Sequence, residues 1–335
     1  MMTVIYLTII VASGLMSYLI VWLIKQRFSQ ALLDIPNERS SHQQPTPRGG
    51  GLGFIIAFAV TSAIYTYVVS LSTPATDELK LIPLLPLWLV YIPLIAVGIF
   101  DDRGGVSAII RYLVQLFAAI LAVTVFGSFP WPLLSQFGEL GSILSILLTI
   151  ISITALINLY NFMDGLDGLV AGVTTVQLGL LANLLNQPIW WLLVAALLGF
   201  ICWNWFPAKI FMGDAGSTFL GASVAMAFLN YGKEPVPAVY ALAIALPMIG
   251  DAVYTLARRL YHRENIFQAH RTHLYQRLQQ SGWSHAQVAT TYICITIMVA
   301  SSISIWGSYA AIISMIGIAT LIILGELYLQ SRSLA

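Results

Sequence analysis

The chain has 335 residues, of which 59% are hydrophobic and 9% are charged. Soluble domains carry about 25% charged residues, so this composition excludes a soluble globular protein and indicates an integral membrane protein. The net charge of +1 gives no sign of nucleic-acid binding. Cys202 and Cys294 both lie inside apolar runs, which indicates neither a disulfide framework nor a zinc site. Because the apolar runs are continuous rather than alternating, we expect an all-α polytopic protein and not a barrel.

Apolar windows of about 20 residues, the length that crosses a bilayer, recur along the chain and predict about eleven membrane-spanning helices. The first run has no basic region before it and is followed by Lys25 and Arg27. We therefore expect a retained first helix with an outside N-terminus rather than a cleaved signal peptide. The division between the last two spans, at Trp306-Gly307, is the least defined. The expected spans are 4–24, 49–70, 81–100, 107–127, 141–158, 169–184, 189–206, 216–230, 236–256, 287–306 and 308–329.

Positive charge supports this topology. With the N-terminus outside, 13 of the 15 Lys and Arg residues fall on the inner side, and Lys80 and Lys233 fall outside. This is the positive-inside pattern of membrane proteins, and it predicts an inside C-terminus. The thirteen inner residues are Lys25, Arg27, Arg39, Arg48, Arg103, Arg111, Lys209, Arg258, Arg259, Arg263, Arg271, Arg277 and Arg332.

The same topology brings most acidic residues and all five histidines to the inner face. We therefore expect one integral membrane domain, residues 1–335, with its active site on the cytoplasmic face. That site must be built from short inner loops and helix ends. The expected inner loops lie near 25–48, 101–106, 159–168, 207–215 and 257–286.

The first inner loop ends in a proline- and glycine-rich segment, Pro45 to Gly51. Arg48 stands beside three glycines and is a candidate phosphate ligand. A topology anchor is the competing interpretation of this arginine.

The third span ends with two adjacent carboxylates, Asp101 and Asp102. Successive helical residues point about 100° apart, so the pair cannot share one face. One of them can face a metal or substrate while the other faces a basic group. Arg111 and Gln115, four residues apart, share one face of the next helix.

A longer polar stretch, Asn158 to Gly172, follows the fifth span. It contains Asn158, Asn161, Asp164 and Asp167 among several glycines. Carboxylates at the end of an apolar helix are costly and mark function by default. Capping of the following helix by Asp167 is the competing interpretation.

The segment Phe211 to Thr218 precedes the eighth span. Helix N-terminal amides favour phosphate, and Asp214 would hold a divalent cation between itself and that phosphate. Phe211 is a candidate stacking partner for a base. An N-cap formed by Asp214 or Ser217 is the alternative.

Two further groups lie toward the C-terminus. Asp251 is an aspartate inside the ninth span, a position typical of either a functional or a helix-pairing residue. Arg271, His273 and Arg277 offer donors suited to a diphosphate, although a basic loop beside anionic lipid headgroups gives the same pattern.

Together these groups supply clustered oxygen ligands, which suit Mg²⁺ or Mn²⁺ better than a soft metal. Cationic donors and an aromatic residue favour a nucleotide diphosphate, and the membrane setting favours a lipid co-substrate. The residues therefore indicate metal-dependent phosphoryl chemistry on a lipid.

In this order, the motifs Asp101-Asp102, NFMDGLDGL (161–169), FMGDAGS (211–217) and HRTH (270–273) resemble the polyprenyl-phosphate N-acetylhexosamine-1-phosphate transferase family, which includes MraY and WecA. The resemblance runs from about 34 to 277. It implies transfer of a sugar 1-phosphate from a UDP-N-acetylhexosamine to undecaprenyl phosphate, with release of UMP, at the bacterial cytoplasmic (inner) membrane.

The resemblance also implies residue roles. Asp214 would be the principal Mg²⁺ ligand, and Asp101 or Asp102 would activate the lipid phosphate or help to hold metal. The remaining implied roles are a nucleotide pocket formed by Asp164, Asp167 and Phe211, support for it from Asn158 and Asn161, and diphosphate binding by Arg271 and His273.

The last loop departs from relatives that carry clustered histidines, because Tyr275 and Gln276 follow His273 and Leu274. HLYQRL resembles the O-antigen-initiating, WbpL-type members that use sugars such as FucNAc or QuiNAc, with UDP-GlcNAc as the alternative.

Two other classes of protein fit the sequence less well. A prenyltransferase would need two aspartate clusters, and this chain has only the Asp101-Asp102 pair. A transporter would need polar groups near the middle of the membrane and on both faces, whereas here the ionisable groups gather on one face. The oligomeric state is left open, a homodimer included.

Overall fold

The structure is a computed structural model that describes residues 2–28, 32–36, 41–42, 44–72, 84–129, 131, 133–229, 238–265 and 270–333. Within these ranges the chain forms twelve α-helices, one short 3₁₀ helix and two short strands. The helices are α1 (Met2–Phe28), α2 (Gly51–Ser72), α3 (Leu84–Gly104), α4 (Ala108–Phe126), α5 (Gly138–Met163), α6 (Leu169–Leu184), α7 (Ile189–Asn204), α8 (Asp214–Leu229), α9 (Ala238–Tyr261), α10 (Leu274–Gln280), α11 (His285–Trp306) and α12 (Ser308–Ser333). The 3₁₀ helix is Leu134–Phe137, and the strands are β1 (Leu33–Asp34) and β2 (Thr46–Pro47).

The helix lengths show a polytopic membrane protein. In the described ranges, eight helices are long and apolar enough to cross a membrane, and α6, α7 and α8 are shorter apolar helices of 16 residues each. Each of these eleven helices coincides with one of the expected apolar windows. The division at Trp306-Gly307 is real, because α11 ends at Trp306 and Gly307 takes a positive φ of 64° before α12 begins.

Helix α8 forms the centre of the molecule. Every residue from Ala215 to Leu229 is buried, as expected for a helix that is apolar all round. Its neighbours are α5, α3, α6 and α2. Asp214, the first residue of α8, is therefore held at one end of the most enclosed element.

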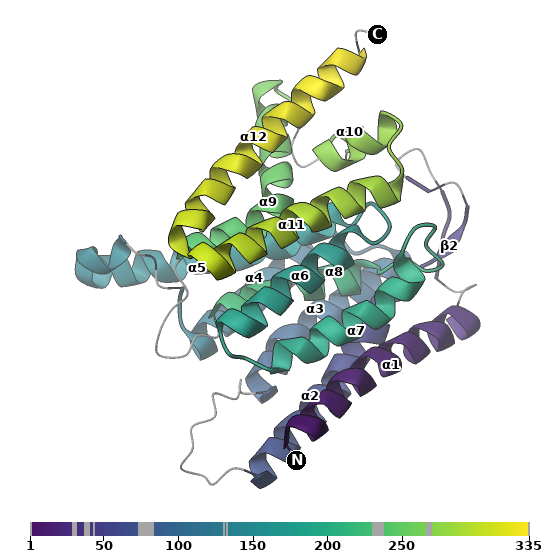
Figure 1. Ribbon diagram of the computed structural model, residues 1–335, viewed down its shortest axis with the longest axis vertical. Coiled ribbons are helices and arrows are strands. Elements are labelled where there is room, and N and C mark those ends of the chain that lie inside the picture. The colour runs from purple at the N-terminus through teal and green to yellow at the C-terminus, as the bar shows by residue number, and fades with distance from the viewer. Residues whose placement is uncertain are drawn as a thin grey trace.

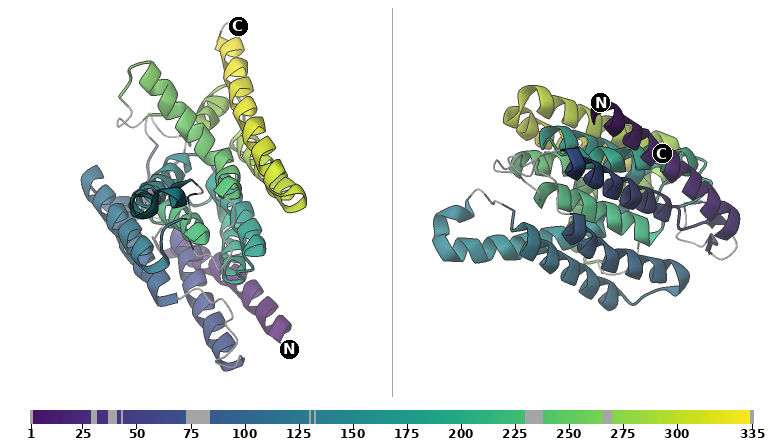
Figure 2. Two further views of the ribbon diagram at one scale, coloured as in Figure 1. Left: turned by 90° about the vertical axis from the view of Figure 1, so that its left-hand side faces the viewer. Right: turned by 90° about the horizontal axis from the view of Figure 1, so that it is seen from below.

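Two groups of helices lie toward opposite ends of the molecule. Helices α1, α2 and α7 pack together toward the N-terminal end of the molecule, and α9, α11 and α12 pack together toward the C-terminal end. The two termini lie at opposite ends of the structure (Figures 1 and 2). On the right-hand side of Figure 1, β2 lies below α10.

Several features differ from the sequence-based expectation. The all-α expectation missed β1 and β2, which pair antiparallel through Leu33 with Pro47 and Asp34 with Thr46. It also missed α10 inside the expected inner loop near 257–286. In addition, α3 and α5 continue to Gly104 and Met163, several residues beyond the expected windows. The reason is that polar residues in the last turn of a helix lower a hydropathy average without ending the helix.

Candidate active site

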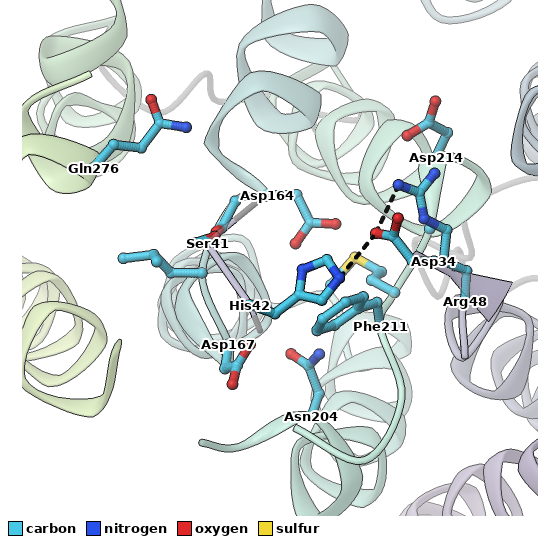
Figure 3. A pocket seen from close by; sticks show the side chains of 14 residues that line it. Asp34, Ser41, His42, Arg48, Asp164, Asp167, Asn204, Phe211, Asp214 and Gln276 are labelled. Carbon is cyan, nitrogen blue, oxygen red and sulfur yellow. Dashed lines mark hydrogen bonds and ion pairs between the residues drawn. The ribbon is translucent and has the colours of Figure 1, made fainter. Parts of the chain in front are cut away.

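A polar cavity of about 230 Å³ lies where several connections meet (Figure 3). Its walls come from the β1–β2 segment, the α5–α6 connection, the end of α7, the segment before α8, and α10. The lining residues are Asp34, Ser41, His42, Arg48, Asp164, Gly165, Leu166, Asp167, Asn204, Phe211, Met212, Gly213, Asp214 and Gln276.

One wall of the cavity is built by the two short strands. Arg48 Nη2 donates to Asp34 Oδ2 at 2.7 Å. The same carboxylate oxygen lies 3.9 Å from His42 Nε2. The His42 ring meets the Phe211 ring edge-on, with 4.8 Å between the centroids. Arg48, predicted as a phosphate ligand, thus lines the cavity with its guanidinium fixed by Asp34.

Phe211 is placed by backbone pairing with the segment that enters α2. The Phe211 N–H donates to the Pro47 carbonyl at 2.8 Å, and the Phe211 carbonyl accepts from Gly50 N–H at 2.9 Å. Close approach explains the glycines here. A Cβ on Gly51 would lie 2.6 Å from the Cα of Gly216. The glycine-rich motif near Arg48 therefore allows α2 and the segment before α8 to touch.

Asp214 meets the end of α5. The Asn161 side-chain amide donates to Asp214 Oδ1 at 3.1 Å and to Ser217 Oγ at 3.0 Å. The second oxygen of Asp214 lies 3.8 Å from Arg111 Nη1. Asn161, predicted to support the pocket, thus orients the carboxylate predicted to bind metal.

Asp102 caps helix α8 from the neighbouring helix α3. Its Oδ1 accepts from the Asp214 N–H at 2.9 Å, and its Oδ2 lies 3.5 Å from the Ala215 nitrogen. Gly213, with φ of 79°, lies against this carboxylate, and a Cβ there would come within 2.6 Å of Asp102 Oδ2. A negative charge at a helix N-terminus is favourable because it satisfies free N–H groups and complements the helix dipole.

Asp101 faces a different partner. Its Oδ1 accepts from the Val106 N–H at 2.6 Å, and its Oδ2 pairs with Arg111 Nη1 at 2.7 Å. The adjacent carboxylates thus bind different groups, although both lie beside Asp214, Asp101 at its side chain and Asp102 at its backbone N–H. Asp101 orders the turn into α4 and fixes Arg111, while Asp102 fixes the start of α8.

Asp164 lies half-buried in the cavity, directly after α5 ends. Its carboxyl group makes no hydrogen bond or ion pair with any residue that the structure describes. Burial, together with the carboxylates of Asp214 and Asp102, raises the pKa of Asp164 to about 8. Asp164 is therefore mostly protonated near pH 7, because burial and the neighbouring carboxylates disfavour a further negative charge there.

Asp167 joins three segments instead of capping α6. Its Oδ2 accepts from the Ala208 N–H at 2.9 Å, and its Oδ1 lies 3.3 Å from His285 Nδ1. The N-cap of α6 is Gly168, whose positive φ of 74° suits glycine and whose N–H donates to Asn204 Oδ1 at 3.0 Å. The capping interpretation of Asp167 is therefore wrong.

Asn158 and Gln115 form a contact away from the cavity lining. The Asn158 amide donates to Gln115 Oε1 at 2.6 Å and to the Thr154 carbonyl at 2.8 Å. Arg111 and Gln115 do share one face of α4, as expected, and that face meets Asp101 and Asn158. The structure places Asn158 in the packing of α4 on α5, one helical turn before Asn161.

The last loop brings Gln276 to the cavity, while His273 lies behind it. His273 is 3% exposed and precedes α10. The His273 N–H donates to Gln276 Oε1 at 3.3 Å, so the amide nitrogen of Gln276 points toward the cavity (Figure 3). Burial and nearby His273 lower the pKa of His270 to about 4, so this histidine is neutral near pH 7. Neither Arg271 nor His273 is among the residues that line the cavity.

Comparison with known proteins places this arrangement in a family. Residues 84–232 match the profile of glycosyl transferase family 4. The decaprenyl-phosphate N-acetylglucosaminephosphotransferase of Mycolicibacterium smegmatis is 30% identical over 298 residues, which cover 78% of this chain and 72% of that protein.

The chain belongs to glycosyl transferase family 4.

Two further relatives are also named as N-acetylglucosaminyl 1-phosphate transferases. The probable undecaprenyl-phosphate N-acetylglucosaminyl 1-phosphate transferase of Bacillus subtilis is 29% identical over 297 residues, covering 82% of this chain and 78% of that protein. The undecaprenyl-phosphate alpha-N-acetylglucosaminyl 1-phosphate transferase of Yersinia pestis is 29% identical over 317 residues, covering 86% and 76%. The family resemblance inferred from the motifs is confirmed.

Several residues that line the cavity were given no role from the sequence. Asp34, Ser41, His42 and Asn204 carry no spacing that marks them as a group. Only a weak pattern in the sequence could have predicted their place. Asp34 and Arg48 carry opposite charges at the two ends of one inner loop, as expected if those ends pair as a hairpin. Gln276 was noticed only as a departure from the histidine pattern of the family.

Proposed function

We propose that this protein transfers an N-acetylhexosamine 1-phosphate from a UDP-sugar to undecaprenyl phosphate, giving undecaprenyl-diphosphate-sugar and UMP. The observation that carries this proposal is the polar cavity in which Arg48, Asp164, Phe211 and Asp214 meet at the ends of membrane helices. The printed names of the relatives, which describe prenyl-phosphate N-acetylglucosamine-1-phosphate transferases, support it.

The nucleotide half of the donor fits the wall formed by Phe211. An aromatic face provides stacking for a base. Asp164 also lines this space, and its carboxyl group can exchange hydrogen bonds with the base or the ribose. Asp167 lines it as well, with its oxygens already held by the Ala208 N–H and His285. Arg48, held by Asp34, provides a charge-assisted donor for the diphosphate.

The residues at the start of α8 fit a hard divalent cation. Asp214 presents an oxygen donor oriented by Asn161. The described residues contain no cluster of three or more His, Cys, Asp or Glu side chains arranged for a metal. The clustered carboxylate ligands expected from the sequence are therefore not seen in the described part of the chain. Asp214 alone remains as the proposed protein ligand, since Mg²⁺ can bind through one or two carboxylates and take its other ligands from phosphates and water. Bound there, Mg²⁺ (or Mn²⁺) would neutralise the charge of the transferring phosphoryl group.

The reaction needs position and charge neutralisation more than a strong base. An oxygen of the lipid phosphate attacks the sugar-bearing phosphorus, and the bond from that phosphorus to the bridging oxygen of UMP breaks. The second pKa of a phosphate monoester is about 6, so the attacking oxygen is already ionised near neutral pH. Asp101 and Asp102 contribute by holding Arg111 and the start of α8 in place.

The setting of the reaction follows from the topology. We place the active site on the cytoplasmic side of the bacterial inner membrane, with eleven spans and an outside N-terminus, because thirteen of the fifteen Lys and Arg residues then lie inside. The product would initiate O-antigen, lipopolysaccharide or a related surface glycan. The names of the relatives favour UDP-GlcNAc as donor, whereas Tyr275 and Gln276 favour a deoxy sugar such as FucNAc or QuiNAc.

A labelled donor tests the transferred group. Purified protein would receive undecaprenyl phosphate, Mg²⁺ and a UDP-N-acetylhexosamine carrying ³²P in the phosphate attached to the sugar. Transfer of the sugar phosphate puts the label into the lipid and releases unlabelled UMP. Label that leaves as UDP would show transfer of the sugar alone and would overturn the proposal.

A further inference from the structure

The buried carboxylate of Asp251 lies outside the proposed chemistry, yet it joins three helices. It is 1% exposed in α9. Its Oδ1 accepts from the Leu274 N–H at 2.8 Å and from Thr255 Oγ1 at 3.1 Å. Its Oδ2 accepts from the Tyr275 N–H at 2.9 Å and from the Tyr292 hydroxyl at 2.7 Å. Both oxygens of this acid are thus satisfied by α9, α10 and α11.

These contacts make Asp251 a second capping group for α10, supplied by another helix and added to the capping box that His273, the N-cap residue, forms with Gln276. Helix α10 has seven residues, and a helix this short has little stability of its own. Its first N–H groups lack partners within the helix, and a carboxylate bound to them gives charge-assisted hydrogen bonds. The far end is held as well, because Arg277 forms a two-pronged ion pair with Glu326 of α12.

Helix α10 carries two side chains to the active-site cavity. The Tyr275 hydroxyl donates to the Phe162 carbonyl at 3.0 Å, at the end of α5 and two residues before Asp164. Gln276 lines the cavity, with its carbonyl occupied by the His273 N–H and its amide nitrogen directed inward. The position of this donor therefore depends on how α10 is held.

We propose that Asp251 is a positioning residue for the sugar end of the donor substrate: by capping α10 it fixes the Gln276 amide where it donates to an acceptor oxygen of the sugar. This inference rests on the proposed function. Asp251 itself does not touch the substrate. The chemistry recognised is a hydroxyl or acetamido oxygen on the hexosamine ring.

The first test is Asp251→Asn, which keeps the shape but replaces one acceptor by an NH₂ group. One backbone N–H of α10 then loses its partner. We expect the KM for the UDP-sugar to rise about tenfold, because the free energy of one charge-assisted hydrogen bond corresponds to about a factor of ten in an equilibrium constant. The KM for undecaprenyl phosphate should stay within about twofold of the wild-type value, within the error allowed for independent sites. An unchanged donor KM, or a lower active fraction with unchanged constants, would overturn the proposal.

A double-mutant cycle separates positioning from general damage. Gln276→Ala removes the proposed contact directly and should also raise the donor KM. If Asp251 acts through Gln276, the double variant has the donor KM of the worse single variant. Independent effects would multiply to about a hundredfold, and that result would contradict the proposal.

If Asp251→Asn fails to fold, two milder variants test the positioning role of Asp251. Tyr292→Phe removes one hydrogen bond to Asp251, and Tyr6→Phe removes a hydrogen bond of similar length, 2.8 Å, between α1 and the start of α7. We expect a raised donor KM from the first variant only. Equal donor KM values in both variants would overturn the proposal.

Hydrogen exchange distinguishes a failure of this inference from a failure of the proposed function. In Asp251→Asn, or in Tyr292→Phe, amide exchange should accelerate in the peptide covering 270–280 and stay unchanged in α8. This readout needs no substrate. Faster exchange in a protein without transferase activity would disprove the proposed function but support the capping of α10 by Asp251. Unchanged exchange in an active enzyme would disprove that capping role.

Discussion

The individual carboxyl groups near the cavity have different binding partners although they lie close together. Asp214 is oriented by Asn161 and lies near Arg111. Asp102 caps α8, and the Asp164 carboxyl group makes no hydrogen bond or ion pair with a described residue. The chemistry available to each acid therefore follows from its partners. We propose Asp214 as the metal ligand because it lines the cavity and its carboxylate is oriented by Asn161.

Asp214→Asn tests this assignment. The change removes the charge but retains the size of the side chain, so α8 should still fold. We expect the turnover number to fall by about a thousandfold, the scale of a lost electrostatic contact in a transition state. Titration of Mg²⁺ should show a weaker dependence of the residual rate. Near-normal turnover would contradict the metal assignment.

A variant of Phe211 tests which of the two substrates this side chain contacts. Phe211→Ala removes the ring that faces the cavity beside His42, and the loss of a stacked base costs about 1–3 kcal/mol. We expect the KM for the UDP-sugar to rise while the KM for undecaprenyl phosphate changes little. Steady-state kinetics with each substrate varied in turn provide the measurement. The reverse order would place Phe211 on the lipid side of the cavity.

At the scale of elements, two helices are capped by an aspartate from another helix. Asp102 of α3 caps α8, and Asp251 of α9 caps α10. Both acids therefore stabilise the start of a helix that faces the cavity. The helices themselves and their approximate limits follow from hydropathy, because span length is a strong signal. The caps could not be predicted, because they join residues more than twenty positions apart.

The adjacent acids Asp101 and Asp102 should accordingly differ when neutralised. Asp102→Asn removes a charged cap and should destabilise the protein by about 1–2 kcal/mol. Asp101→Asn leaves α8 intact and should lower activity through Arg111 with a smaller change in thermal stability. Unfolding in detergent and UMP release, measured on both variants, check this. Equal, mild losses in both would mean that each acid only ends a helix.

At the scale of the whole molecule, sequence patterns located the cavity only in part. Asp164, Asp167, Phe211, Asp214 and Arg48 were predicted and all line it. Asn161 lies one contact away, at Asp214. Five predicted site residues are not among those that line it: Asp101, Asp102, Asn158, Arg271 and His273. The sequence could not show this, because position along the chain does not tell which side of a helix end faces the cavity.

The orientation in the membrane can be tested with single cysteines. In a variant in which Cys202 and Cys294 are replaced, we would introduce cysteine at Gln136, expected outside, or at His262, expected inside. Both positions are exposed. A membrane-impermeant maleimide should label intact cells only at 136. Labelling at 262 alone would show the opposite orientation.

The most direct test of the proposed reaction is UMP release by the purified protein in detergent. UDP-GlcNAc, UDP-GalNAc, UDP-FucNAc and UDP-QuiNAc would be offered in turn with undecaprenyl phosphate and Mg²⁺, and each component would be omitted once. The proposed reaction predicts UMP from at least one donor, only when lipid and metal are both present, and little from Asp214→Asn. A well-folded protein that releases no UMP from any donor would contradict it.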